Sequence, residues 1–314
     1  MTQRRLGRSE LSFEPLVFGG NVFGWTLEEA DAFKVLDAFV DEGFTAIDTS
    51  NSYGKGKSET ILGRWIKARG NRDKVLVFTK VGSEMLAPED KGLSAAYIAR
   101  AVEESLSRLG TDYIDLYQAH WPDPNTPQAE TLEAFDRLVK AGKVRTIGAS
   151  NHTAEMHEEA ERISAEKGLA RYESEQPEYN LYVRERFEGK LQDFCIRHEV
   201  GVIPYFSLAA GFLTGKYRSE ADFGKSPRGA RMGRYLDARG KAILAAMDRV
   251  SAETGASLAE IALAWLIAQP GVTAPIASAT SVEQLRSLAR GARLELSAEQ
   301  LRALTEAGKQ TEAV

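Results

Sequence analysis

Short apolar runs, rich in β-branched and aromatic residues, alternate along this chain with longer segments whose apolar residues recur at helical spacing. Each short run predicts a strand and each longer segment an amphipathic helix. The predicted strands lie near residues 15–21, 44–49, 75–81, 113–119, 144–149, 172–177, 201–206 and 272–277. Eight strands alternating with helices are typical of a closed parallel barrel. We therefore expect an α/β fold, a (β/α)8 TIM barrel, as one domain over residues 1–314.

The main structural alternative is a doubly wound open sheet, which also alternates strands and helices. That fold usually has fewer strands, and its dinucleotide-binding members have a Gly-x-Gly-x-x-Gly motif after the first strand, which is absent here. Signals at helix ends support the barrel. Thr26 is predicted to cap the helix after it, Gly43 and Gly110 to end helices, and Ser281 with Gln284 to form a capping box.

Three segments fall outside the strand–helix repeat. Residues 3–13 alternate around Gly7-Arg8-Ser9 and predict an N-terminal β-hairpin that is not part of the barrel. Residues 211–234, rich in Gly, Arg and Ser, form a long connection that leads into an extra helix and is a candidate lid. The last helical segment, SAEQLRALTEAGK, is expected to pack across one end of the barrel. We thus expect extra helices near the C-terminus.

The composition limits the classes of function. The 314 residues are 43% hydrophobic and 27% charged, as in ordinary globular proteins. The net charge of −5 and the absence of a long Lys/Arg run argue against nucleic acid as a partner. Cys195 is the single cysteine, so neither an intramolecular disulfide nor a thiolate cluster can form. No apolar run approaches 18 residues and no signal peptide is recognisable, so we expect a cytoplasmic protein without a membrane partner.

Ionisable residues follow three consecutive predicted strands, at the barrel end where active sites of this fold lie. Asp48 ends the strand FTAID and Tyr53 follows in TSNSYG, Lys80 ends VLVFTK, and His120 ends YIDLYQAH. Singly, each of these residues is more typical of a solvated strand end or of packing. Because a barrel brings its strand ends together, the four together predict a catalytic site.

This set of side chains can act as an acid. An ammonium group beside a phenol stabilises the phenolate, so Lys80 is expected to lower the pKa of Tyr53, while Asp48 keeps Lys80 charged and oriented. His120 can hydrogen-bond the oxygen of a substrate carbonyl. The chemistry that needs a proton on oxygen and no nucleophile is reduction of a carbonyl. No pattern of ligands predicts a metal site.

The same residues carry a resemblance to the aldo-keto reductase family that covers nearly the whole chain. The segments that resemble it are FTAIDTSNSYGKGKSETILGRWI, VLVFTKVG, YIDLYQAHWPD, VRTIGASN, EQPEYNLYVRE, IPYFSLAAGFLTGKY and SVEQL. The family's catalytic tetrad of Asp, Tyr, Lys and His falls on Asp48, Tyr53, Lys80 and His120. The resemblance therefore implies an NADP-dependent oxidoreductase that reduces aldehydes or ketones.

The resemblance also implies a nicotinamide cofactor extended across the barrel mouth without a Rossmann fold. Ser150, Asn151 and Gln176 would bind the carboxamide, Tyr205 would stack on the nicotinamide ring, and residues 206–216 and 276–290 would follow the pyrophosphate and the adenosine. The other implied cofactor residues are Gly20, Asn21, Asp48, Phe206, Ser207, Leu208, Gly211, Leu213, Gly215, Lys216, Ile276, Ser278, Thr280, Gln284 and Arg290.

The chain departs from the family at the adenosine end. Members commonly have a Gly near Ala277-Ser278, and an Arg that often meets the 2′-phosphate stands where this chain has Thr280. Lys216, Arg286 or Arg290 could supply that charge, and the helix N-terminus at Thr280-Ser281 suits an anion. We expect NADPH/NADP+ to be preferred and NADH to remain usable.

The substrate is expected to be a small carbonyl compound bound among the loops 23–30, 84–92, 121–128 and 217–235. Trp25 and Trp121 are the predicted substrate residues, and Met85, Phe223 and Tyr235 add to an apolar pocket. Neither the particular substrate nor the oligomeric state is predicted.

Two alternative functions remain. A class I aldolase would use Lys80 to form a Schiff base, without needing the Asp48–Tyr53 pair. A regulatory subunit of the same fold would sense the cofactor while binding a membrane channel, as relatives of the family do. Only about fifteen residues precede the first predicted barrel strand, so we expect no long N-terminal arm for such a role.

Overall fold

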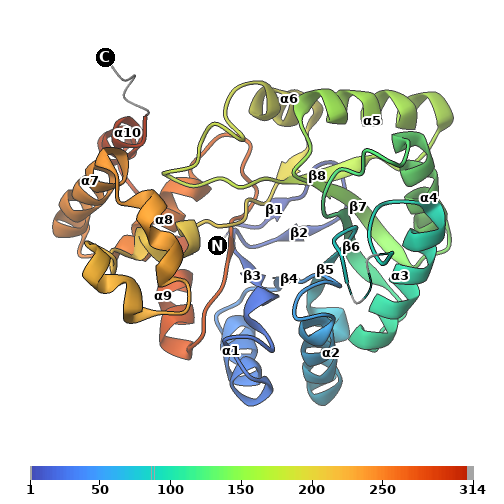
Figure 1. Cartoon of the computed structure of the whole chain (residues 1–314), viewed down its shortest axis with the longest axis horizontal. Coiled ribbons are helices and arrows are strands. Elements are labelled where there is room, and N and C mark those ends of the chain that lie inside the picture. Colours follow the sequence, from blue (N-terminus) through green and yellow to red (C-terminus); the bar gives the residue numbers. More distant parts are fainter. Residues whose placement is uncertain (1, 86, 88, 310–314) are drawn as a thin grey trace.

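The computed structural model describes residues 2–85, 87 and 89–309, and its centre is a sheet of eight parallel strands (Figure 1). Their spatial order is β10-β3-β4-β5-β6-β7-β8-β9. The strands are β3 (Val17–Gly19), β4 (Ala46–Asp48), β5 (Leu76–Val81), β6 (Ile114–Ala119), β7 (Val144–Ser150), β8 (Tyr172–Gln176), β9 (Gly201–Val202) and β10 (Ile276–Ala277). All eight predicted strands are confirmed, although β9 and β10 have only two residues each.

The ring closes between β9 and the segment that leads into β10. Val202 forms an isolated parallel bridge with Val272, and the amide of Thr273 donates to the carbonyl of Val202 at 2.8 Å. The two edge strands are therefore joined, and the predicted (β/α)8 barrel is confirmed.

Helices surround the sheet and connect its strands. Figure 1 shows α1 to α6 distributed around the strands, whereas α7 to α10 gather on one side. The helices are α1 (Glu29–Asp41), α2 (Lys57–Arg69), α3 (Ala95–Leu109), α4 (Gln128–Lys140), α5 (Ala154–Lys167), α6 (Lys190–His198), α7 (Ala238–Thr254), α8 (Leu258–Ile267), α9 (Val282–Arg293) and α10 (Ala298–Ala307).

Within the described residues, no single helix has the length and apolar character needed to span a membrane. Only α7 and α8 counted together, across a bend of 98°, reach that length and composition.

The predicted hairpin is present and covers the end of the barrel where the strands begin. Strand β1 (Arg4–Arg5) pairs antiparallel with β2 (Ser12–Phe13). The ring of Phe13 lies 5.4 Å from that of Phe78, in one buried cluster with Leu116 and other barrel residues. The Arg4 guanidinium donates to the carbonyls of Ile267 and Val272 at 3.0 and 2.9 Å, so it ties the hairpin to the segment before β10.

The predicted helix ends are partly confirmed. Gly110 ends α3 in the left-handed conformation, with φ 63°. Thr26 is not the cap of α1, because the amides of Trp25, Thr26 and Leu27 all turn back to the carbonyl of Val22 and the helix begins only after Glu28. Ser281 caps α9, but the Gln284 side chain accepts from the Thr280 amide and not from Ser281, so the capping box is incomplete.

The long connection after β9 contains three short 3-10 helices, η3 (Ala209–Thr214), η4 (Glu220–Lys225) and η5 (Gly229–Tyr235). They lead into α7, the predicted extra helix. The C-terminal α10 packs against α7, and Trp265 of α8 donates to the Thr305 hydroxyl of α10 at 3.0 Å. This whole group of elements forms a second buried apolar cluster beside the barrel.

Candidate active site

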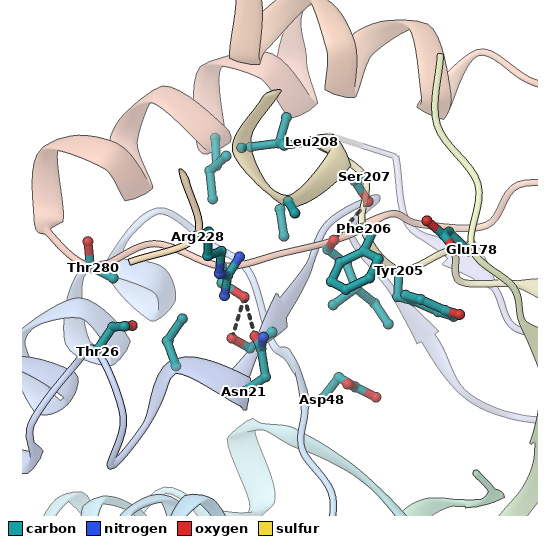
Figure 2. A pocket seen from close by; sticks show the side chains of 18 of the residues that line it. Asn21, Thr26, Asp48, Glu178, Tyr205, Phe206, Ser207, Leu208, Arg228 and Thr280 are labelled. Atoms are coloured by element: carbon teal, nitrogen blue, oxygen red, sulfur yellow. Dashed lines mark hydrogen bonds between the residues drawn. The ribbon is translucent and has the colours of Figure 1, made fainter. Parts of the chain in front are cut away.

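The carboxyl ends of the barrel strands open into a cavity of about 1100 Å³ (Figure 2). Asp48 is the last residue of β4, Lys80 lies near the end of β5 beside Gln118 of β6, and His120 directly follows β6. Tyr53 stands in the turn after β4. The structure therefore brings together the four residues that the strand ends predicted.

Lys80 and Asp48 form a buried ion pair beneath Tyr53. The Lys80 ammonium is fully buried and lies 2.6 Å from Asp48 Oδ2. It donates to the carbonyl oxygen of Thr49 at 2.8 Å and to the hydroxyl oxygen of Tyr53 at 3.3 Å. Gln176 supports the carboxylate by donating to Asp48 Oδ1 at 3.1 Å. Asp48 thus contacts both Lys80 and Gln176, so side chains from the ends of three strands are held together.

The balance of charges sets the pKa of each partner. Burial raises the pKa of Tyr53 above its usual value, and Lys80 offsets this only in part. The expectation that the net pKa of Tyr53 is lowered is therefore wrong for the protein alone, because burial outweighs the ammonium. For Lys80, burial by itself lowers the pKa, but Asp48 and Tyr53 raise it above the usual range and keep the ammonium charged.

His120 lies against the same phenol, with its ring 5.8 Å from that of Tyr53 in an edge-to-face arrangement. Burial holds the pKa of His120 well below its usual range, and the Lys80 charge lowers it further, so the imidazole is neutral near pH 7. Its Nδ1 lies 2.9 Å from the Ser83 hydroxyl and 3.2 Å from that of Ser50. When Nδ1 accepts a hydrogen bond from a serine hydroxyl, Nε2 carries the single ring proton and is a hydrogen-bond donor.

A chain of hydrogen bonds joins the residues expected to hold a nicotinamide. The Tyr205 hydroxyl donates to Asn151 Oδ1 at 2.9 Å. The Asn151 amide donates to the carbonyl of His120 at 3.1 Å and to the Ser150 hydroxyl at 3.0 Å. The Ser150 hydroxyl in turn donates to the carbonyl of Gln176 at 2.7 Å. These four side chains all line the cavity.

The cavity continues from this group toward the start of α9. Figure 2 shows Tyr205 and Glu178 at one end and Thr280 and Arg228 toward the other. Ser278 lies between them and donates to Gly19 and Asn21, both at 2.7 Å. The expected cofactor residues that line this part are Asn21, Phe206, Ser207, Leu208, Gly211, Lys216, Ile276, Ser278, Thr280 and Gln284.

Four expected cofactor residues lie outside the cavity lining: Gly20, Leu213, Gly215 and Arg290. The carbonyl of Gly20 accepts from Ser58, and Leu213 is fully buried in the cluster beside the barrel. Arg290 is paired with Glu260 of α8 at 2.8 Å, and Arg286 faces Glu42 at 3.9 Å. Of the three cations expected to supply charge, only Lys216 lines the cavity.

Arg228 is a cavity residue that the sequence did not single out. It lies between η4 and η5, and its guanidinium carbon is 5.1 Å from the centre of the Trp25 ring. No hydrogen bond or ion pair of its side chain occurs within the part of the chain that the structure describes. The Gly/Arg/Ser-rich composition marked this segment as functional, but it could not show which of its cations points inward.

Of the predicted apolar pocket, only the two tryptophans line the cavity. Trp25 and Trp121 are 53% and 48% exposed. Met85 is buried away from the cavity, and Phe223 and Tyr235 belong to the cluster beside the barrel, where Tyr235 stacks on Phe212 at 5.2 Å. In the loop 84–92, Leu86 and Pro88 lie outside the described residues.

A buried polar cluster lies on the outer face of β8, behind the residues that are expected to hold a nicotinamide. His157 of α5 is 2.9 Å from Glu175 Oε2, and the His152 ring is 5.8 Å from that of His157. Burial raises the pKa of Glu175 to about 8 and lowers that of His157 to about 4. His152 also contacts the carbonyl of Ser150 at 3.0 Å, so the cluster supports the turn that presents Asn151.

Comparison with known proteins shows which family model and which relatives this chain matches. The model of the Aldo/keto reductase family matches residues 15–309. Aldo-keto reductase YhdN of Bacillus subtilis (strain 168) is 35% identical over 89% of this chain and 84% of its own length. The uncharacterized oxidoreductase YrpG of the same organism is 36% identical over 96% of this chain and 94% of its own length. A probable voltage-gated potassium channel subunit beta of Arabidopsis thaliana is 31% identical over 91% and 89%.

Proposed function

Because this chain belongs to the aldo/keto reductase family and is an oxidoreductase of that kind, we propose that it reduces aldehydes or ketones to alcohols with NADPH. The observation that carries the proposal is the buried Asp48–Lys80 pair, whose ammonium donates to the Tyr53 hydroxyl inside the cavity. This arrangement provides one proton donor and no free nucleophile. The cytoplasm, where NADPH is held reduced, is the proposed site of action.

Each of the four residues has a distinct role in the proposed reaction. Tyr53 gives its phenolic proton to the carbonyl oxygen as the alcohol forms. Lys80 stabilises the phenolate that remains, and Asp48 keeps the ammonium charged and in place. His120, neutral and with Nδ1 engaged by serines, donates from Nε2 to the same oxygen and orients the carbonyl.

The cavity fits an extended dinucleotide. It is long, and two cations that line it, Lys216 and Arg228, have no carboxylate partner within the described residues. At Gly19 a Cβ would lie only 2.6 Å from the Ser278 hydroxyl, so a side chain there would intrude on the cavity wall. Ser150, Asn151, Gln176 and Tyr205 would hold the nicotinamide. When bound, the reduced nicotinamide supplies the hydride.

We propose that NADPH is preferred because Lys216 and Arg228 add positive charge toward the adenosine end of the cavity. The Thr280 hydroxyl and the start of α9 lie at the same end, where a helix N-terminus favours an anion. Arg290 no longer belongs to this set, since Glu260 holds it. NADH remains usable because the nicotinamide half of the site does not depend on these charges.

The decisive experiment replaces Tyr53 with Phe. We expect turnover of an aldehyde to fall by roughly 10²- to 10⁴-fold, because a general acid is removed. The affinity for NADPH, measured by fluorescence titration, should stay nearly the same, since Tyr53 is not among the proposed cofactor contacts. Tyr113→Phe is the matched control, because its phenol lies between Arg72 and Arg145, away from the cavity. Retained turnover in Tyr53→Phe would contradict the mechanism.

An aldolase is disfavoured by the state of Lys80. A Schiff base needs a neutral amine, whereas the pKa of Lys80 is raised and its ammonium is paired with Asp48. Trapping of a carbonyl compound on Lys80 by borohydride would support that alternative.

A role as a channel subunit rests on the names of relatives such as that of Arabidopsis thaliana. It predicts tight binding of NADPH without appreciable turnover. Steady NADPH oxidation across a panel of aldehydes, cyclic ketones and keto-sugars favours the reductase.

A further inference from the structure

A charged cluster lies at the end of the cavity opposite Thr280. Glu178 follows β8 and pairs through its backbone with Tyr205, and Figure 2 shows the two side by side. Arg186 Nη1 lies 3.0 Å from Glu178 Oε2, and Arg234 Nη2 lies 4.0 Å from Oε1. The Glu178 side chain is 8% exposed, so its carboxylate is held between two guanidinium groups.

This cluster carries an excess positive charge beside the cavity. Two guanidinium groups surround one carboxylate, which leaves a net charge of about +1 at neutral pH. Glu178 and Arg186 both line the cavity, and the Arg186 side chain is 57% exposed. Glu178 engages only Nη1 of the guanidinium among the described residues, so Nε and Nη2 remain available to a ligand.

The proposed cofactor does not use this charge. Its phosphate groups are assigned to Lys216 and Arg228, and Figure 2 shows Arg228 beside Asn21, well separated from Glu178. Tyr205, the proposed stacking residue for the nicotinamide, lies beside Glu178 in that view, at the end of the cavity away from Arg228. Arg186, which pairs with Glu178, is therefore at the nicotinamide end of the cavity, opposite the end assigned to the adenosine.

We propose, on the basis of the proposed reductase function, that Arg186 selects carbonyl substrates that also carry a carboxylate. With the carbonyl oxygen at Tyr53 and His120, the carboxylate reaches the Arg186 guanidinium, whose fork of N–H groups matches two carboxylate oxygens. Glu178 holds the Arg186 guanidinium at the wall of the cavity through their ion pair. Phe206 and Trp121, 38% and 48% exposed, line the cavity and suit the apolar body of such a substrate.

The test compares two aldehydes of nearly equal shape, 4-formylbenzoate and the neutral 4-formylbenzamide, with NADPH at low ionic strength. A charge-assisted contact corresponds to roughly tenfold or more in kcat/KM. The wild-type protein should therefore prefer the carboxylate by about tenfold or more. Arg186→Gln should remove that preference, mainly through a higher KM for the carboxylate, while kcat/KM for the amide changes by a much smaller factor. Arg186→Lys should restore part of it.

Arg197→Gln is the matched control, because it makes the same change of charge on the exposed face of α6, outside the cavity. Equal kcat/KM for both aldehydes in the wild-type protein, or a preference that persists in Arg186→Gln but disappears in Arg228→Ala, overturns the assignment while the reductase function stands. If neither aldehyde nor any other carbonyl compound supports oxidation of NADPH, the reductase function itself is contradicted.

Discussion

All three protons of the Lys80 ammonium have an acceptor: Asp48 Oδ2, the carbonyl of Thr49 and the Tyr53 hydroxyl. An ammonium group has three N–H donors, so this side chain has no hydrogen bond to spare. The three acceptors therefore hold the ammonium group in one position and keep it charged. Two of these partners, Asp48 and Tyr53, line the cavity. Of the two, the Tyr53 phenol is the group that can release a proton there.

Replacement of Lys80 by Met tests this role. We expect carbonyl reduction to fall by about a hundredfold or more, because the phenolate left by proton transfer loses its cation. Lys80 lowers the pKa of Tyr53, so without it that pKa rises further. The decline of the residual rate at alkaline pH should accordingly move to higher pH. A pH–rate series measures this, with the exposed Lys74→Met as control. An unchanged profile at normal rates would make Lys80 purely structural.

The grouping of the proposed catalytic side chains could be predicted, but the electrostatic balance among them could not. Asp48, Lys80 and His120 stand directly at strand ends, and a barrel necessarily brings those ends together. The pKa of Tyr53 depends instead on how deeply the phenol is buried, which the order of residues does not reveal. For that reason the sequence predicted a lowered pKa for Tyr53, whereas burial raises it.

The connection between β9 and α7 is the element that shapes the long half of the cavity. Ala209, Ala210 and Gly211 have φ values of 47°, 56° and 104°, a left-handed run that is costly for the two alanines. This run lets the backbone turn sharply under the cavity. Farther on, residues 226–228 line the cavity again, and Arg228 meets Trp25 from the loop after β3.

Arg228→Ala is expected to weaken the preference for NADPH over NADH. A charge-assisted contact to the 2′-phosphate is worth about 1.5–3 kcal/mol, so the ratio of the two dissociation constants should change by about tenfold or more. Titration of both cofactors measures that ratio. Lys216→Ala should act in the same direction. Arg290→Ala serves as control, since Glu260 already engages that guanidinium. An identical ratio in all the variants would place the phosphate elsewhere.

Predictability at the level of elements follows the strength of the local pattern. Strands β5 to β8 agree with their predicted ranges to within a residue, and most residues of each of these strands are buried. The ends of β9 and β10 were less well predicted, since apolar residues continue beyond the paired backbone. Which residue of 211–234 faces the cavity depends on tight turns among η3, η4 and η5, for which the sequence has no period.

For the molecule as a whole, stability and chemistry are located at opposite ends of the barrel. The hairpin β1–β2 packs where the strands begin, with Leu6 and Phe13 fully buried. The proposed catalytic residues lie where the strands end. Substitutions in the hairpin should consequently change the free energy of unfolding without changing the reaction.

Arg4→Ala provides this test. Its guanidinium donates to two carbonyls that precede β10, and loss of hydrogen bonds to a charged group costs about 1.5–3 kcal/mol. The free energy of unfolding in urea should fall by that amount, while kcat/KM of the folded protein stays constant. Arg5→Ala is the control, because Arg5 is exposed and its guanidinium, among the described residues, bonds only to the nearby carbonyls of Arg8 and Ser9. A loss of activity in folded Arg4→Ala would show that the two ends communicate.

The hydrogen-bond chain from Tyr205 through Asn151, Ser150 and Gln176 to Asp48 joins one loop and three strand ends. A change at Tyr205, Asn151, Ser150 or Asp48 leaves a neighbour with an unpaired donor or acceptor, and a change at Gln176 does so for Asp48 but not for Ser150, whose acceptor is a backbone carbonyl. The effects of two such changes will then not add, whereas changes at distant, unconnected sites usually do. The order of substitutions therefore matters in the evolution of this site. Which residue is tolerated at Asn151 or Gln176 depends on the residue already present at the neighbouring position of the hydrogen-bond chain.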